Sequence, residues 1–298
     1  MSDAEYDKLR GLFQEAEELV KKRLYEKALD NLQECEKLSL AFPGSRFIYE
    51  TRRLISLCMF SLHRLDEAVY ERELAAEEIA RLGDYDEAGE IYKELGDRLR
   101  IAGKTDAARK YYSLAQLSFN TWVSKDRNEP SPPEAWVAWA LVCQAEAANT
   151  EEMKLKTFVQ ASEKFAEAAE KKKVFENFYR SRELFLKARV ALIMASRGNI
   201  SANNSALRRA HEFFDESSNA DISWPLARAC EKLTSALLLL EKTESQAKRL
   251  LIDAKNILRK LEKKDVADKL RSLIDKFLFD NRRNTVSFCR SVEENLVI

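Results

Sequence analysis

The sequence predicts an all-α protein, a right-handed α-solenoid of about six helix-turn-helix repeats with a C-terminal capping helix. Glycine (7 residues) and proline (5) are scarce among 298 residues, so the chain has little of the turn chemistry that sheets and hairpins require. Charged residues make up 34% of the chain, which is typical of amphipathic helices with solvated outer faces. Small residues also recur at a constant spacing, which indicates repeated helix pairs.

The clearest helix pair lies between Gly89 and Phe119. Apolar residues at helical spacing mark a first helix that ends at Gly103, and Thr105 is suited to begin the second. Gly96 and Ala108 are small, as required where two antiparallel helices approach closely. We therefore expect a tight helical hairpin here.

The same pattern occurs twice earlier in the chain. Ala28, Ala68 and Ala108 follow one another at intervals of 40 residues. A small residue lies seven positions after each of the first two alanines: Cys35 after Ala28, and Ala75 after Ala68. Amphipathic stretches precede both, at 4–22 and 47–62. The spacing predicts three successive helix pairs with long helices.

The polar, proline-containing segment 124–133 interrupts this pattern. We therefore divide the chain into N-terminal repeats at 1–123, a loop or hinge at 124–133, C-terminal repeats with a cap at 134–280, and a short helix or flexible tail at 281–298. The later helix pairs are expected at 134–148 with 150–172, 175–197 with 205–216, and 224–241 with 244–260, and the cap at 264–280.

The best-defined pair resembles the tetratricopeptide-repeat superfamily. The residues at the matching offsets are Leu95, Gly96, Gly103, Ala108, Tyr112 and Ala115. In that family the first helix of each repeat lines a concave surface, so the resemblance implies a surface for a peptide or helix of a partner protein. The implied partner-binding residues are Phe13, Glu17, Lys21, Glu50, Arg53, Leu57, Phe60, Glu90, Lys93, Asp97 and Arg100. Burial between long helices is the alternative for Phe13, Leu57 and Phe60.

A looser resemblance covers the whole chain. The long helix pairs, the repeat of near forty residues and the C-terminal cap are similar to those of the soluble attachment proteins, which link a hexameric ATPase to membrane-fusion helix bundles. This resemblance implies, as the alternative function, an adaptor in vesicle traffic.

No pattern typical of an enzyme stands out in the sequence. The two histidines, His63 and His211, are far apart, and no His or Cys set has metal-ligand spacing. Neither a G-x-S-x-G elbow nor a G-x-G-x-x-G loop occurs. We therefore expect a non-enzymatic protein without catalytic residues, cofactor or metal.

The cellular setting follows from cysteines and hydropathy. Five cysteines lie far apart, form no C-x-x-C pair and read as reduced, buried residues. The first residues are acidic and polar, so no signal peptide is expected, and no apolar run approaches the ~20 residues of a membrane span. We expect a cytoplasmic protein.

Charge is distributed unevenly along the chain. Residues 1–100 carry 16 basic and 23 acidic side chains, a net of −7, whereas residues 171–298 carry 26 and 17, a net of +9. This asymmetry could steer an acidic partner to one end of the chain and a basic partner to the other. The alternative is that these charges belong to solvated helix faces that happen to segregate. The basic residues of 248–271 alternate with acidic ones and lack interleaved aromatic residues, so we expect no nucleic-acid binding. Peripheral contact with an anionic membrane stays an alternative.

Overall fold

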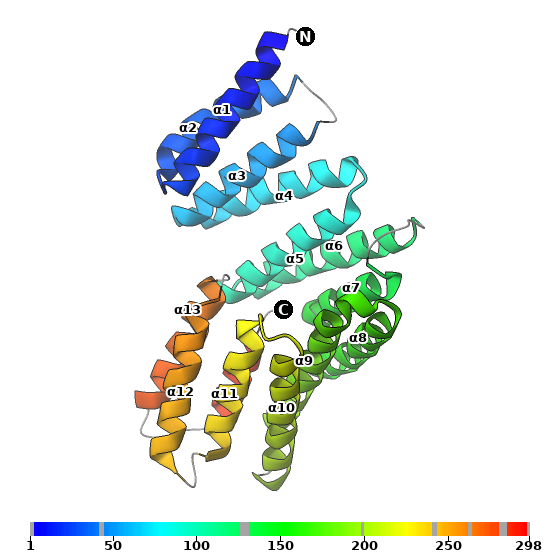
Figure 1. Ribbon diagram of the computed structural model, residues 1–298, viewed down its shortest axis with the longest axis vertical. Coiled ribbons are helices and arrows are strands. Elements are labelled where there is room, and N and C mark those ends of the chain that lie inside the picture. Colours follow the sequence, from blue (N-terminus) through cyan, green and yellow to red (C-terminus); the bar gives the residue numbers. More distant parts are fainter. Residues whose placement is uncertain are drawn as a thin grey trace. The chain divides into compact units, whose positions relative to one another are not determined.

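The computed structural model describes residues 3–41, 45–125, 131–197, 200–239, 243–261, 264–279 and 285–296. Within these ranges the chain is all-α, as predicted, and contains no strand (Figure 1). The elements are α1 (Asp3–Lys21), α2 (Tyr25–Ser39), α3 (Arg46–Ser61), α4 (Leu65–Arg81), α5 (Tyr85–Ile101), α6 (Thr105–Val123), α7 (Pro133–Ala147), α8 (Glu151–Lys171), the 3₁₀ turn η1 (Lys173–Phe175), α9 (Glu176–Ala195), α10 (Ile200–Ala220), α11 (Pro225–Leu239), α12 (Glu244–Leu258), α13 (Lys264–Phe279) and α14 (Thr285–Glu294).

Consecutive helices form hairpins, the arrangement of an all-α helical-repeat solenoid. Among the described residues, the pairs run from α1/α2 to α11/α12, and α13 follows where a cap was predicted. Most of the observed helix ends lie within a few residues of those expected from the sequence, because apolar periodicity and turn residues are local signals. Positions 126–130 of the predicted 124–133 loop lie outside the described residues.

Several turns end a helix in the same way. The chain takes a positive φ at Arg23 (59°), His63 (61°), Gly83 (94°) and Gly103 (79°). The next amide then donates to a carbonyl five residues back, as Lys104 N does to Leu99 O at 2.8 Å. This is the Schellman motif, which satisfies carbonyls at the helix end and favours glycine. Gly103 therefore ends its helix as predicted.

The forty-residue spacing corresponds to equivalent buried positions. Ala28, Ala68 and Ala108 are 0%, 0% and 1% exposed. Cys35 and Ala75, seven positions after the first two, are fully buried. Because a larger side chain at these positions would separate the helices, the repeated small residues are a packing requirement.

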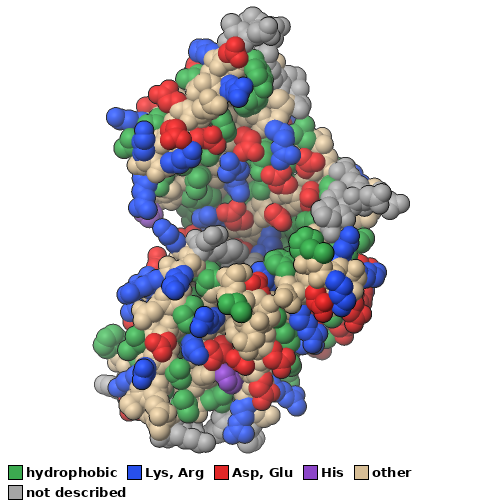
Figure 2. Space-filling model, in the orientation of Figure 1, with side chains coloured by type: hydrophobic (Ala, Val, Ile, Leu, Met, Phe, Trp, Pro, Cys, Tyr) green, Lys and Arg blue, Asp and Glu red, His purple; other side chains and the backbone are tan. Residues whose placement is uncertain are grey.

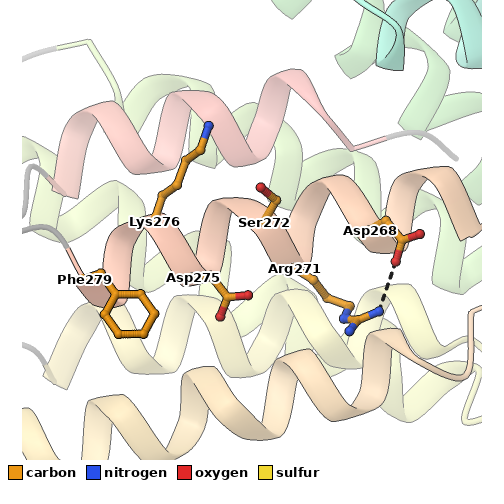
Figure 3. Close-up of a pocket in the computed structure, with 6 residues that line it drawn as sticks. All are labelled: Asp268, Arg271, Ser272, Asp275, Lys276 and Phe279. Atoms are coloured by element: carbon orange, nitrogen blue, oxygen red, sulfur yellow. Dashed lines mark hydrogen bonds and ion pairs between the residues drawn. The ribbon is translucent and has the colours of Figure 1, made fainter.

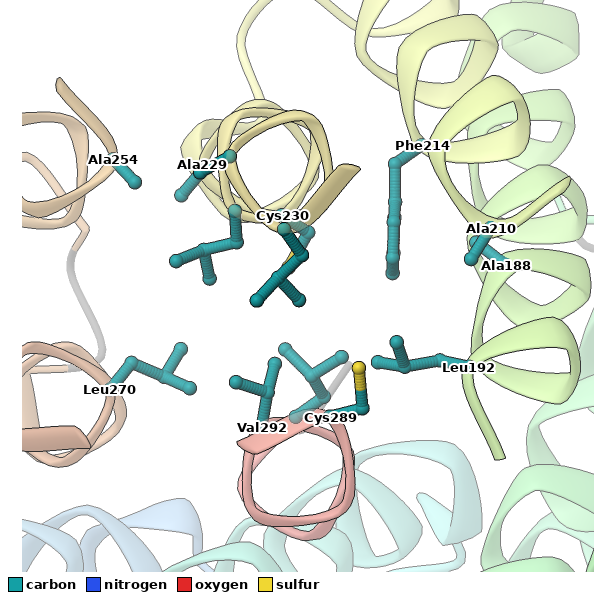
Figure 4. Packing of buried hydrophobic residues seen from close by; sticks show 14 of the residues in the cluster. Ala188, Leu192, Ala210, Phe214, Ala229, Cys230, Ala254, Leu270, Cys289 and Val292 are labelled. Carbon is teal, nitrogen blue, oxygen red and sulfur yellow. The ribbon is translucent and has the colours of Figure 1, made fainter. Parts of the chain in front are cut away.

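The chain divides into two compact units, and each has its own core. The first unit comprises Met1–Leu95 and Leu117–Trp122, and the second comprises Gly96–Gln116 and Val123–Ile298. In the first unit α1, α2 and α3 share a buried apolar cluster. In the second unit one cluster joins α7, α8 and α9, and a larger one joins α9 to α14 (Figure 4).

All five cysteines are buried and none forms a disulfide bond, as predicted. Burial raises the pKa of Cys35 and of Cys58 to about 11, because desolvation penalises the thiolate. A search of the described helices finds none long and apolar enough to span a membrane.

Gly96 provides a direct test of close helix packing. A Cβ atom at this position would lie 2.8 Å from Cδ1 of Tyr112. That ring is 1% exposed, and its hydroxyl donates to Asp97 Oδ1 at 2.9 Å, so it has little room to move. We predict that Gly96→Ala lowers the free energy of unfolding by about 1–3 kcal/mol, measured by chemical denaturation.

Gly11→Ala in α1 is the matched control. No atom lies within 4 Å of a Cβ built at Gly11, and the residue is exposed. Because alanine is the better helix former, this change is expected to stabilise the protein by up to about 1 kcal/mol. Equal effects of the two substitutions would contradict the packing at Gly96.

Candidate functional site

The partner-binding residues expected from the sequence lie on α1, α3 and α5, the first helices of the first three pairs. On α1 and α3 they retain solvent-accessible surface. Leu57 is 39% exposed and Lys21 is exposed, whereas Glu17, Glu50, Arg53, Phe13 and Phe60 are half-buried. Partner binding by these residues stays a prediction.

The apolar members of this set differ in their surroundings. Phe13 packs against the core of the first unit, and its ring lies edge-on to that of Phe47 at 6.1 Å between centroids. Leu57, by contrast, presents more than a third of its surface to solvent. Leu57 is therefore the better candidate for an apolar contact with a partner.

Three charged members, Lys21 of α1 and Glu50 and Arg53 of α3, pair with near neighbours on their own helices. Arg53 Nε lies 2.8 Å from Glu50 Oε2, and Lys21 Nζ lies 2.7 Å from Glu18 Oε1. Exposed pairs of this kind contribute little to stability, because water solvates both charges well. They can therefore exchange their intramolecular contacts for contacts with a charged partner.

The α5 residues of the predicted set have different environments. The side chain of Glu90 is exposed to solvent. Its pKa is nevertheless raised, first by desolvation and then by the negative charge of Asp86, because many protein atoms surround a carboxylate that water still reaches. Lys93 and Asp97 are only 8% and 4% exposed. Arg100 has a side chain 12% exposed and contacts Glu146 and the carbonyl oxygen of Leu296. These last three side chains are thus largely enclosed by the protein itself.

A buried charge network lies in the second unit. Arg189 is fully buried, with Nη1 2.7 Å from Glu146 Oε1 and Nη2 2.8 Å from Glu293 Oε1. Arg100 also contacts Glu146, and Lys154 Nζ lies 3.0 Å from Glu293. The network therefore connects α5, α7, α8, α9 and α14. Its members are so far apart in the chain that no local sequence pattern indicated it.

Electrostatics hold the network in its charged form. Burial alone would raise the pKa of Glu146, but the positive charges of Arg100, Arg189 and Lys154 outweigh it and lower the pKa to about 2. Burial opposes the charge of Glu293 too, yet Arg189 and Lys154 lower its pKa. The arrangement suits structural ion pairing, in which each buried charge has an opposite partner.

A shallow hollow of about 450 Å³ lies along α13 (Figure 3). Its lining residues are Asp268, Arg271, Ser272, Asp275, Lys276 and Phe279. Because all six belong to one helix, the hollow is a stretch of helix surface. Arg271 pairs with Asp268 at 3.0 Å, and Lys255 of α12 pairs with Asp275 at 2.6 Å. Both carboxylates of the hollow are thus paired within the protein.

Surface charge is mixed in the view of Figure 2, where acidic and basic side chains alternate over the visible face of each unit. Among the described residues no group of three or more His, Cys, Asp or Glu side chains is arranged to hold a metal ion. The surface of α1 and α3 therefore remains the candidate site that the geometry supports best.

The charge network generates a prediction about acid stability. The pKa of Glu146 in the folded protein is below its value of ~4.3 in the unfolded chain, so the unfolded chain binds more protons at acidic pH. The free energy of unfolding therefore decreases as the pH is lowered from about 4.5 to about 2. Glu146→Gln removes the carboxylate and leaves buried cations uncompensated, so we expect a loss of about 3–5 kcal/mol at pH 7.

The difference in unfolding free energy between the parent and Glu146→Gln should narrow as the pH falls from 7 to 3, measured by urea denaturation at each pH. Glu18→Gln is the matched control, because it breaks only an exposed pair with Lys21 and should have little effect. A constant difference across this pH range would show that Glu146 has the same pKa in the folded and unfolded states, and a widening difference would show that it is protonated in the folded state; either result contradicts the lowered pKa.

No protein-family model matches this sequence, and no curated protein matches it.

Proposed function

We propose that the protein is a non-enzymatic, cytoplasmic adaptor that binds a peptide or helix of a partner protein on the exposed faces of α1 and α3. The observation that carries the proposal is the combination on one helix, α3, of the exposed Leu57 with the accessible ion pair of Glu50 and Arg53. Stacked helix pairs present such faces side by side, which suits an extended partner segment.

The charge of the region indicates the chemistry of the partner. Residues 1–100 carry 16 basic and 23 acidic side chains, a net of −7. A partner segment with basic residues around an apolar anchor is therefore favoured, because opposite charges speed association and the anchor supplies affinity.

The alternative is an adaptor like the attachment proteins, linking an ATPase to membrane-fusion helix bundles. Helices α8 and α10 have 21 residues each, which fits the long helix pairs of such proteins. This alternative predicts partners whose association depends on ATP.

Affinity capture with the purified full chain, read by mass spectrometry with and without ATP, distinguishes the two functions. Partners retained regardless of nucleotide support the general adaptor. Recovery of a hexameric ATPase, or of fusion helices released on ATP hydrolysis, supports the alternative.

A single substitution tests the proposed surface. Leu57→Ala is expected to weaken binding of a captured partner about fivefold or more, because truncating an apolar anchor at the centre of an interface costs about 1 kcal/mol or more. Titration calorimetry with the purified partner measures this change.

Leu117→Ala is the matched control, because Leu117 is also an exposed leucine of the first unit, at 64% exposure, but lies on α6. Equal affinity for Leu57→Ala and Leu117→Ala would place the binding surface elsewhere.

A further inference from the structure

The C-terminal helix α14 differs from the helices that precede it. It has 10 residues, whereas the other α-helices have between 15 and 21. An isolated helix of this length is marginal in water, so contacts with the rest of the chain must hold it. Its buried apolar residues are Phe288, Cys289, Val292 and, just beyond the helix, Leu296, at 5%, 2%, 4% and 0% exposure. Arg290 and Glu294 are exposed. The segment is therefore amphipathic.

Figure 4 shows α14 between α9 and α13, with its apolar side chains turned towards α11. The ring of Phe288 stacks on Phe277 of α13, with 4.2 Å between centroids. Cys289 and Val292 belong to the same cluster as Leu192 of α9 and Cys230 of α11. A helix whose apolar face lies among other helices has the geometry by which proteins bind amphipathic partner helices.

The charges around α14 show what the site requires of its occupant. Arg100, Lys154 and Arg189 bring three cations to the network, and the second unit without α14 pairs them with the carboxylate of Glu146; Asp97, which accepts a hydrogen bond from Tyr112, adds a nearby negative charge. Glu293 of α14 supplies the other ion-paired carboxylate. Removing it would leave Arg189 Nη2 without its ion pair in a fully buried position, which is strongly unfavourable. The site therefore selects an acidic occupant.

The end of the segment is also held by hydrogen bonds. Arg100 Nη2 donates to the carbonyl oxygen of Leu296, and Arg290 Nη2 donates more weakly to the carbonyl oxygen of Ser196 at 3.5 Å. The first of these contacts involves only the backbone of the occupant, so any helix ending at this point offers the same acceptor.

We propose that the face of α9, α11 and α13 is a binding site for an amphipathic helix, and that α14 occupies it until a partner helix of the same pattern displaces it. The partner pattern, counted from Phe288, has apolar residues at positions i, i+1, i+4 and i+8 and a carboxylate at i+5. This proposal rests on the adaptor function, because it adds a second site at which an adaptor would bind a partner helix. Because α14 belongs to the same chain, its effective concentration at the site is high, and a partner helix must compete with it. The apparent affinity for the partner is therefore lower than the affinity for an empty site.

Peptide binding in trans tests this proposal with full-length protein. The probe is a fluorescent peptide of residues 283–298 with serine in place of Cys289, and binding is read by anisotropy. Val292→Asp in the full chain should release α14 and bind the probe at least tenfold more tightly than the parent. Glu294→Ala, an exposed change on the same helix, should behave as the parent.

The identity of the side chains is tested with the peptide itself. A probe that carries Glu293→Gln should bind the Val292→Asp chain at least tenfold more weakly, because it cannot balance the cations. A Val292→Asp chain that is folded and does not bind the unmodified probe overturns the proposal.

If the Val292→Asp chain does not fold, thiol labelling of the unmodified parent tests whether α14 can leave its site. Cys289 on α14 and Cys230 on α11 are both buried, at 2% and 1% exposure. Excess unlabelled peptide should accelerate alkylation of Cys289 at least fivefold, located by mass spectrometry, and leave Cys230 protected. An unchanged rate at Cys289 would show that α14 is a permanent part of the core. Either failure leaves partner binding at Leu57 unaffected, so the two proposals are separable.

Discussion

Close approach between neighbouring helices is the constraint on which the rest of this structure depends. A single helix pair cannot enclose its own apolar faces, so each pair is stable only when it packs against the next. That contact requires small residues at Ala28, Ala68 and Ala108, which are all buried. Where even alanine is too large, as at Gly96 beside Tyr112, the chain has glycine. Steric exclusion thus sets the repeat, and burial of the apolar faces supplies the stability.

Charge has different roles in the two units. In the first unit the pairs of Lys21 and Arg53 are accessible to water, so they contribute little to folding and remain available to a partner. In the second unit Arg189 is fully buried between Glu146 and Glu293. Desolvation makes each of those charges depend on its partners, so the ion pairs of Glu293 join the apolar contacts in holding α14.

The proposed protein binding rests on these two features together. Exposed apolar surface on α3 stays open to a partner, whereas the comparable face of α9, α11 and α13 is already covered by a segment of the same chain. A protein with one open and one internally occupied surface can respond to two different helices or peptides. Competition between α14 and a partner helix would then regulate the second surface, without any change in the fold of the other helices.

The sequence by itself determined the all-α class, the hairpin repeat, most helix ends and the burial of the cysteines, because periodicity, small residues and turn glycines act over a few residues. The offsets of the repeat also identified α1, α3 and α5 as one class of helix. Only the tertiary structure decided that Asp97 and Arg100 are enclosed while Leu57 is exposed. It likewise decided that residues 285–294 form a helix packed on α9 and α13. Several of these outcomes depend on contacts between residues far apart in the chain, such as Arg100 with Glu146 and Leu296, and no local pattern encodes such contacts.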